Sequence, residues 1–401
     1  MKKVVSLALI IFATTQAQSP IGLGLPTGLP VQSTTGPSSS MGGAGTGISD
    51  ENFGLTLNPA NMAIQNRSAF SGVVSLDYLQ IKQGSSKSLL NDYSPKLLSL
   101  IIPAGLAGNF GFAIEKRGEA ALRFQLKDQS GLGAIYTEIQ RSGGSTAWQG
   151  GWGYKIGKGP SIGILYERIY SDITSSETRR SVIEVDSVNI ESSISKNSVM
   201  ESATNGIKMG VLMPIGKFSV GVAGEYSFYD DNGKYQTEYL KADTTERSDQ
   251  KLFLHLPPSI RAGVGYHYSP EWLFAADIQA TLWERFKSDI DLFRPLRRTY
   301  QISAGTRYIP SPDQLTAPYV ETVHYRAGLR YNQLPVDGTQ EYSLSLGAGL
   351  PISEDGGLID IVFEAGRRTD SRYSGYSENL FSVQLGINGG RNWFQKKGPS
   401  Y

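Results

Sequence analysis

The sequence predicts an all-β protein, a transmembrane antiparallel β-barrel of about 14 strands with an N-terminal hatch, or plug, in its lumen. Segments of about ten residues repeatedly alternate large apolar side chains with small or polar ones, as tilted membrane strands do. The N-terminus has the pattern of an export signal, with Lys2 and Lys3 before the apolar run 4–13. No later run reaches the roughly 18 consecutive apolar residues that a spanning helix needs. Together these observations favour an exported barrel.

Residues 217–230 show the alternation most clearly. One face carries Phe218, Val220 and Val222, whereas the other carries Ser219 and Gly221. A soluble sheet would bury its large apolar face and expose the small one. A barrel wall turns the apolar face to lipid and the small face to the lumen.

Composition is compatible with this assignment and excludes several other classes. The chain has 401 residues and a net charge of +1, and 39% of its residues are hydrophobic. This moderate hydrophobic fraction suits a barrel, because the polar lumen dilutes the apolar lipid face. The near-neutral charge argues against nucleic acid as a partner. With no cysteine, a disulfide framework and a thiolate metal site are excluded, and we expect no metal and no cofactor.

The chain divides into four parts. Residues 1–17 are predicted to be a signal peptide, ending in small residues at the cleavage positions. Residues 18–67 are rich in Gly, Pro, Ser and Thr without regular periodicity, and are predicted to form the hatch. Residues 68–394 are predicted to form the barrel and 395–401 a short periplasmic tail.

The alternating segments define the expected strands. They lie near 68–82, 95–103, 109–117, 145–156, 160–172, 197–213, 217–230, 258–268, 271–287, 299–309, 320–331, 340–350, 357–367 and 379–388. Segments 121–127 and 133–140 also look strand-like and are interpreted as a hairpin excursion of a loop, although counting both would give about sixteen strands. Short and long connections alternate, which places the short turns and both barrel ends in the periplasm. The polar segments 173–196 and 231–251 are expected to be extracellular loops.

Alternation also predicts charged side chains in the lumen, because an Arg at the lipid midplane costs about 2–4 kcal/mol. Arg326 and Arg330 lie four residues apart, and Asp360 and Glu364 have the same spacing two strands later. We therefore expect an ionic network. Its members are Arg261, Asp277, Arg307, Arg326, Arg330, Asp360 and Glu364. The sequence leaves open whether it braces the barrel, seats the hatch or contacts a substrate.

Residues 41–63 contain Gly-Gly-Ala-Gly, then an acidic residue, then Asn58-Pro59-Ala60 shortly before the first strand. This order resembles the plug of the FadL-like long-chain fatty-acid and hydrophobic-compound transporter family. The stretches 256–266, 325–331 and 345–351 also look like members from Bacteroidetes and related bacteria. The resemblance implies an outer-membrane barrel whose hatch admits hydrophobic molecules that leave through a gap in the wall. It also implies a hatch or gating role for Asn58, Pro59 and Ala60.

One departure from the family concerns the first ligand site. Many members have hydrophobic external loops, whereas 173–196 and 231–251 are polar here. Segment 83–100 is interpreted as a loop that retains apolar side chains. The candidate ligand-capture residues in it are Leu89, Leu90, Tyr93, Leu97 and Leu98.

The resemblance implies uptake of long-chain fatty acid-like or aromatic compounds across a Gram-negative outer membrane. The alternative is a protein-interaction role in a secretion system of the type IX kind. An enzyme is not expected and no catalytic residue is assigned, because His255, His267 and His324 are scattered and no hydrolase motif occurs. Expected partners are outer-membrane lipid, a hydrophobic ligand, the barrel-assembly machinery for insertion and, in the alternative, secretion-system proteins.

Overall fold

The computed structural model describes one antiparallel sheet that closes on itself. It describes residue 25 and residues 27–83, 86–130, 133–185, 188–241, 244–289, 295–312, 317–352, 357–372 and 375–391. The predicted signal peptide and the predicted tail lie outside these residues.

Over the described ranges the barrel wall has 14 strands, as the sequence predicts. They are β2 (Ser68–Gln83), β3 (Ser86–Pro103), β4 (Asn109–Glu119), β6 (Gly133–Lys155), β7 (Ser161–Val185), β8 (Val188–Ile215), β9 (Phe218–Ser227), β12 (Ser259–His267), β13 (Trp272–Thr281), β15 (Thr299–Tyr308), β16 (His324–Gln333), β17 (Thr339–Pro351), β18 (Leu358–Asp370) and β19 (Tyr376–Arg391). The last strand pairs with the first, from Arg391 against Ser68 to Tyr376 against Gln83, and closes the barrel.

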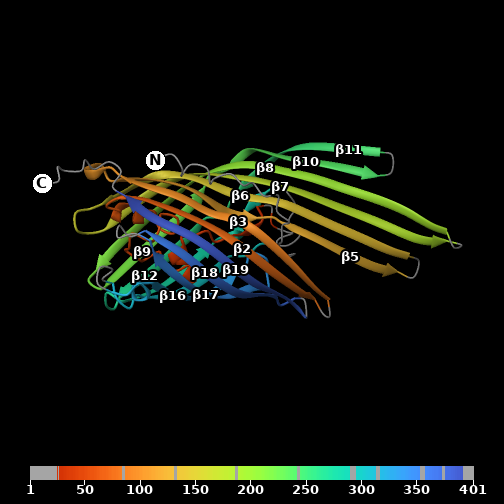
Figure 1. The fold of residues 1–401 in the computed structure, drawn as a ribbon. Coiled ribbons are helices and arrows are strands. Elements are labelled where there is room, and N and C mark those ends of the chain that lie inside the picture. The colour runs from red at the N-terminus through yellow and green to blue at the C-terminus, as the bar shows by residue number, and fades with distance from the viewer. Residues whose placement is uncertain are drawn as a thin grey trace, which may run out of the picture.

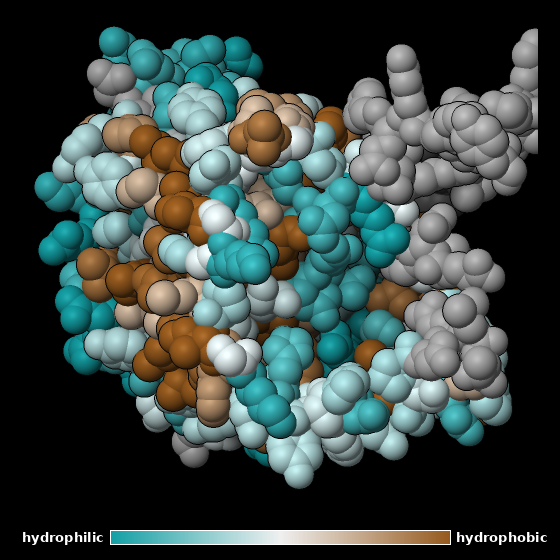
Figure 2. Space-filling view, turned by 90° about the vertical axis from the view of Figure 1, so that its left-hand side faces the viewer, coloured by the Kyte–Doolittle hydropathy of each residue, from teal (hydrophilic) through white to brown (hydrophobic). Residues whose placement is uncertain are grey.

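The two faces of the wall have the predicted chemistry. In β9 the large side chains Phe218, Val220 and Val222 are exposed, whereas Ser219 and Ala223 are buried. In a membrane the exposed face is covered by lipid. Viewed from the end at the left of Figure 1, brown hydrophobic residues gather in a column beside a middle filled by teal hydrophilic residues (Figure 2). No helix among the described residues is long and apolar enough to cross a membrane.

The predicted extracellular loops are wrong in form, because most of their residues continue the strands. β7 extends to Val185 and β8 begins at Val188, so segment 173–196 is largely a hairpin. Segment 231–251 forms a second hairpin from β10 (Asp230–Lys241) and β11 (Thr244–His255). Their alternating Ser, Thr and charged residues suit a strand that has water on both faces.

The hairpin excursion predicted for 121–127 and 133–140 is present. Strand β5 (Leu122–Ser130) pairs with the first part of β6, from Leu122 against Arg141 to Ser130 against Gly133. Strands β5, β6, β7, β8, β10 and β11 therefore form one sheet that extends past the end of the barrel (Figure 1). We call it the projecting sheet.

Leu25 and residues 27–67, hereafter the N-terminal segment, lie inside the barrel, where Figure 1 shows them in red between the strands. The segment contains β1 (Leu29–Pro30), the short helix α1 (Gly36–Ser40) and the 3-10 helix η2 (Pro59–Ile64). Helix α1 packs on β16 to β19 and η2 packs on β4 and β6 to β8, so the segment crosses the lumen from one wall to another. Short elements are also present at the ends of barrel strands: η3 (Gly105–Ala107), η4 (Trp283–Arg285), β14 (Lys287–Ser288) and α2 (Tyr319–Thr322).

Candidate functional site

Asn58, Pro59 and Ala60 lie deep in the lumen, at the start of η2. The Asn58 amide Nδ2 donates to the carbonyl oxygens of Thr46 at 2.9 Å and Val211 at 3.0 Å. Its Oδ1 accepts from the backbone N–H of Ala60 at 3.0 Å and caps the helix. Pro59 at the first helical position has no N–H to satisfy there. This motif therefore joins two parts of the N-terminal segment to β8.

Glycines on the wall make room for this motif. A Cβ at Gly210 of β8 would lie 2.0 Å from Asn58 Oδ1, and one at Gly163 of β7 would lie 2.3 Å from the Pro59 backbone. Both distances are shorter than any tolerated contact. The many glycines of the sequence thus include positions where the wall and the N-terminal segment touch without side chains between them.

Asp277 of β13 holds a second part of the N-terminal segment. Its Oδ2 accepts hydrogen bonds from the backbone N–H groups of Gly45 at 3.0 Å and Thr46 at 2.9 Å, and from the Thr46 hydroxyl at 2.7 Å. Arg261 of β12 lies 3.7 Å from the same carboxylate. These two members of the predicted charge network are therefore neighbours that bind the N-terminal segment.

Four other predicted members form two ion pairs between β16 and β18. Arg326 contacts Asp360 at 2.6 Å, with both side chains almost fully buried. Arg330 contacts Glu364 and also donates from NH1 to Gln32 of the N-terminal segment at 2.9 Å. The spacing of four residues on each strand therefore corresponds to two ion pairs that follow one another along the wall.

Arg307, the seventh predicted member, reaches a partner that the sequence did not suggest. Its NH1 lies 2.5 Å from Asp50 in the N-terminal segment. Burial alone would raise the pKa of Asp50, but the nearby Arg307 charge and the hydrogen bond from the Asn52 backbone lower it to about 2. The carboxylate is thus held in its charged form.

A further ionic cluster on the inner face centres on Arg117, which lies outside the network that the sequence analysis named. Arg117 of β4 contacts Glu225 of β9 at 2.8 Å and also contacts Glu167 of β7. Lys208 of β8 donates to the carbonyl of Thr56 in the N-terminal segment. The alternation of β7 and β8 could have placed Glu167 and Lys208 on the inner face.

A second cluster that the sequence analysis missed lies next to the two ion pairs between β16 and β18. Arg368 of β18 contacts Glu341 of β17 at 2.6 Å and Glu378 of β19 at 2.8 Å. Glu341 also lies 3.4 Å from Arg330. The cluster therefore continues the ion pairs of β16 and β18 toward the projecting end of the barrel.

The wall is not paired continuously beside β3. Strand β3 pairs with β4 only between Leu97 and Pro103, and within the described residues its first part, 86–96, pairs with β2 alone. The upper edge of β4 instead pairs with β1, Leu29 against Glu119 and Pro30 against Gly118. The backbone N–H of Val31 extends this pairing to the Arg117 carbonyl at 2.9 Å. We call this place the β3–β4 break.

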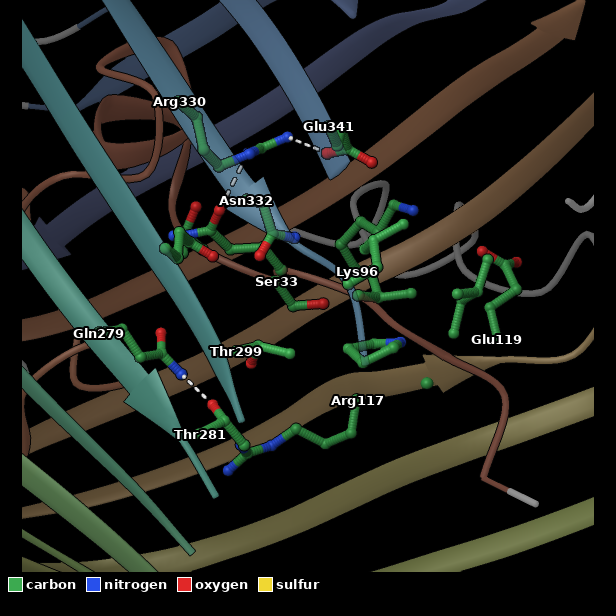
Figure 3. A pocket seen from close by; sticks show the side chains of 18 of the residues that line it. Ser33, Lys96, Arg117, Glu119, Gln279, Thr281, Thr299, Arg330, Asn332 and Glu341 are labelled. Atoms are coloured by element: carbon green, nitrogen blue, oxygen red, sulfur yellow. Dashed lines mark hydrogen bonds and ion pairs between the residues drawn. The ribbon is translucent and has the colours of Figure 1, made fainter. Parts of the chain in front are cut away.

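A cavity of about 380 Å³ lies between the N-terminal segment and the wall beside the β3–β4 break. It touches both sides of the break, with Lys96 of β3 on one side and Glu119 of β4 on the other, as well as Leu29 of β1. Figure 3 shows Arg330 turned toward Glu341, while Gln279 and Thr281 come from another strand. Polar side chains and apolar ones such as Trp283 line the same space.

The segment predicted as an apolar loop is part of β3, so its side chains alternate between two faces. Leu89, Tyr93 and Leu98 are exposed on the outside, whereas Leu97 is buried in the lumen against Leu55 and Met62 of the N-terminal segment. The side chain of Leu90 lies outside what the structure describes. The five candidates therefore do not form one surface. Among the described residues, no group of three metal-ligating side chains comes together.

A family model described as BamG matches residues 1–398. The chain belongs to the BamG family. No curated protein matches this BamG-family chain.

Solved structures share its fold at low sequence identity. A FadL homologue of Pseudomonas aeruginosa has a TM-score of 0.67 and 14% identity, over 90% of this chain and 99% of that one. The toluene transporter TodX of P. putida has a TM-score of 0.61 and 14% identity, over 92% and 99%. The monoaromatic hydrocarbon channel CymD has a TM-score of 0.59 and 15% identity, over 92% and 100%. The FadL-type barrel that the sequence suggested is therefore confirmed as the fold of this BamG-family protein.

Proposed function

We propose that the protein is an outer-membrane channel through which small hydrophobic compounds enter the cell. The observation that carries this proposal is the cavity of about 380 Å³ that meets the β3–β4 break. An apolar molecule gains about 25 cal/mol for each Å² that leaves water, so a path from a partly apolar cavity to lipid is downhill. The transport described for TodX and CymD agrees with this use of the fold.

In this proposal the N-terminal segment is the hatch, delivered to the outer membrane behind a cleaved signal peptide formed by residues 1–17. Asn58, Pro59 and Ala60 hold its lower part against β8, and β1 covers the break from inside. Only two residues of β1 pair with β4, whereas a barrel strand pair extends over many more. Release of β1 therefore breaks less pairing than the separation of two barrel strands.

The test is uptake of radiolabelled toluene by Gram-negative cells that lack their own hydrocarbon channel. We expect the full chain to increase uptake, and Ala223→Leu, which adds volume to the cavity lining, to reduce it. Ala203→Leu, at a residue of β8 outside the cavity lining, is the matched control. The channel would be refuted if cells with the full chain on their surface took up no more toluene than cells without it.

A second candidate function is protein interaction within outer-membrane barrel assembly, to which the family name relates. The projecting sheet favours it, because its six strands extend past the barrel and carry many polar side chains. Deletion of residues 231–251 would remove one hairpin of this sheet. Loss of co-purifying assembly proteins with retained toluene uptake would assign the two functions to different parts of the molecule.

A further inference from the structure

The cavity lining is balanced in charge. Among the described residues it includes six basic side chains, Lys96, Arg117, Lys208, Arg261, Arg330 and Arg368, and six carboxylates, Asp77, Glu115, Glu119, Glu225, Glu341 and Glu364. Each of the six basic groups has a carboxylate within 4.0 Å. An anionic ligand would therefore have to compete with a protein carboxylate for each basic group of this lining.

The basic groups are also fixed by further bonds. Arg330 contacts Glu364 and Glu341 and donates to Gln32. Arg368 contacts both Glu341 and Glu378. A ligand carboxylate that took one of these guanidinium groups would leave a buried glutamate without its counter-charge, which is costly.

Two uncharged polar groups of the lining have no partner of their own. Gln301 Nε2 on β15 and Ser343 Oγ on β17 are buried and make no hydrogen bond. Both atoms have almost no accessible surface, so a rotation of either side chain toward the cavity would let a ligand oxygen pair with it and remove the cost of a buried unpaired group. Apolar side chains, including Leu29, Leu334 and Trp283, line the same cavity.

We propose that the ligand of this cavity is uncharged and carries one hydrogen-bonding oxygen on an apolar body, as an alcohol, ketone or ester does. The inference rests on the proposed channel function and specifies its substrate class. A fatty-acid carboxylate is disfavoured because the lining offers it no unpaired cation. A pure hydrocarbon would fit but would leave Gln301 unsatisfied.

The experiment compares 8-bromo-1-octanol with 8-bromooctanoate at pH 8, where the acid is ionised. The full chain is placed in lipid nanodiscs, and bromine quenching of tryptophan fluorescence reports binding. Trp283 lines the cavity, so the part of the quenching that disappears in Trp283→Phe belongs to this site. We expect the alcohol to bind this site about tenfold more tightly, since one unpaired charge costs at least the 1.4 kcal/mol of a decade in affinity.

Two variants test the cause. Glu364→Gln leaves the lining with one uncompensated positive charge near Arg330 and should tighten bromooctanoate binding about tenfold relative to the alcohol. Gln301→Leu should weaken the alcohol about fivefold through loss of one hydrogen bond. Glu271→Gln, at the turn before β13 and outside the lining, is the control and should change neither.

The outcomes separate the two proposals. If bromooctanoate binds as tightly as the alcohol, the substrate class is refuted while the channel function stands. If neither compound quenches Trp283, the cavity takes no small amphipathic molecule and the substrate class is refuted, whereas toluene uptake still decides the channel function.

Discussion

The side-chain oxygen of Asn58 lies 2.0 Å from the point where a Cβ would stand on Gly210. At this point the wall strand β8 and the N-terminal segment therefore touch through backbone and the Asn58 amide, with no other side chain between them. The same amide donates to Val211, the next residue of β8. This contact fixes the depth at which the N-terminal segment lies.

Gly210→Ala is expected to displace Asn58 and to destabilise the folded barrel by about 1–3 kcal/mol, the usual cost of overpacking a closed site. Thermal unfolding in detergent measures the effect. Gly389→Ala is the matched control, because a Cβ there meets nothing within 4 Å. Equal midpoints for the two variants would contradict the close contact.

Asn58→Ala removes the donor to Thr46 and Val211 and leaves their carbonyl oxygens without this partner. We expect a loss of about 1–3 kcal/mol, with faster protease cleavage of the N-terminal segment. Asn61→Ala is the comparison, since its amide makes one long bond of 3.5 Å to Gly54. If both variants are cleaved at the same rate, Asn58 is not the residue that holds the segment.

Asp360→Asn leaves Arg326 charged and buried without its counter-ion, which costs about 3–5 kcal/mol. Glu238→Gln in the exposed pair with Arg247 on the projecting sheet should cost less than about 1 kcal/mol. The two midpoints of heat-induced unfolding give the difference. A small effect at Asp360 would mean that water reaches the Arg326–Asp360 ion pair and screens its charges.

The Asp50–Arg307 contact predicts a dependence on acid. Because the folded-state pKa of Asp50 is lowered from 3.8 to about 2, its contribution of about 2 kcal/mol is complete above pH 4 and is lost as the pH falls toward 2. Unfolding measured at pH 5, 3.5 and 2 should show this loss in the native chain. Asp50→Asn should remove that part of the dependence, and an unchanged pH profile in this variant would exclude Asp50 as its source.

The strands were predictable because lipid outside and side chains inside impose an alternation that each segment displays by itself. Alternation also placed Arg326 and Asp360 on the inner face. It carries no information about which inner residues meet, so the Asp50–Arg307 pair and the Asn58 contacts could not be foreseen. The hairpin 173–196 was misjudged since polar residues on both faces look like a loop, although they also suit a strand in water.

The central claim is that the cavity opens to lipid at the β3–β4 break when β1 leaves β4. The double variant Leu29→Cys/Glu119→Cys places two cysteines on directly paired residues of a chain that otherwise has none. The measurement is toluene uptake by cells that carry this variant, oxidised and then reduced, with Leu29→Cys alone as the control. We expect uptake to fall when the disulfide forms and to recover on reduction; unchanged uptake with the disulfide fully formed would contradict the account.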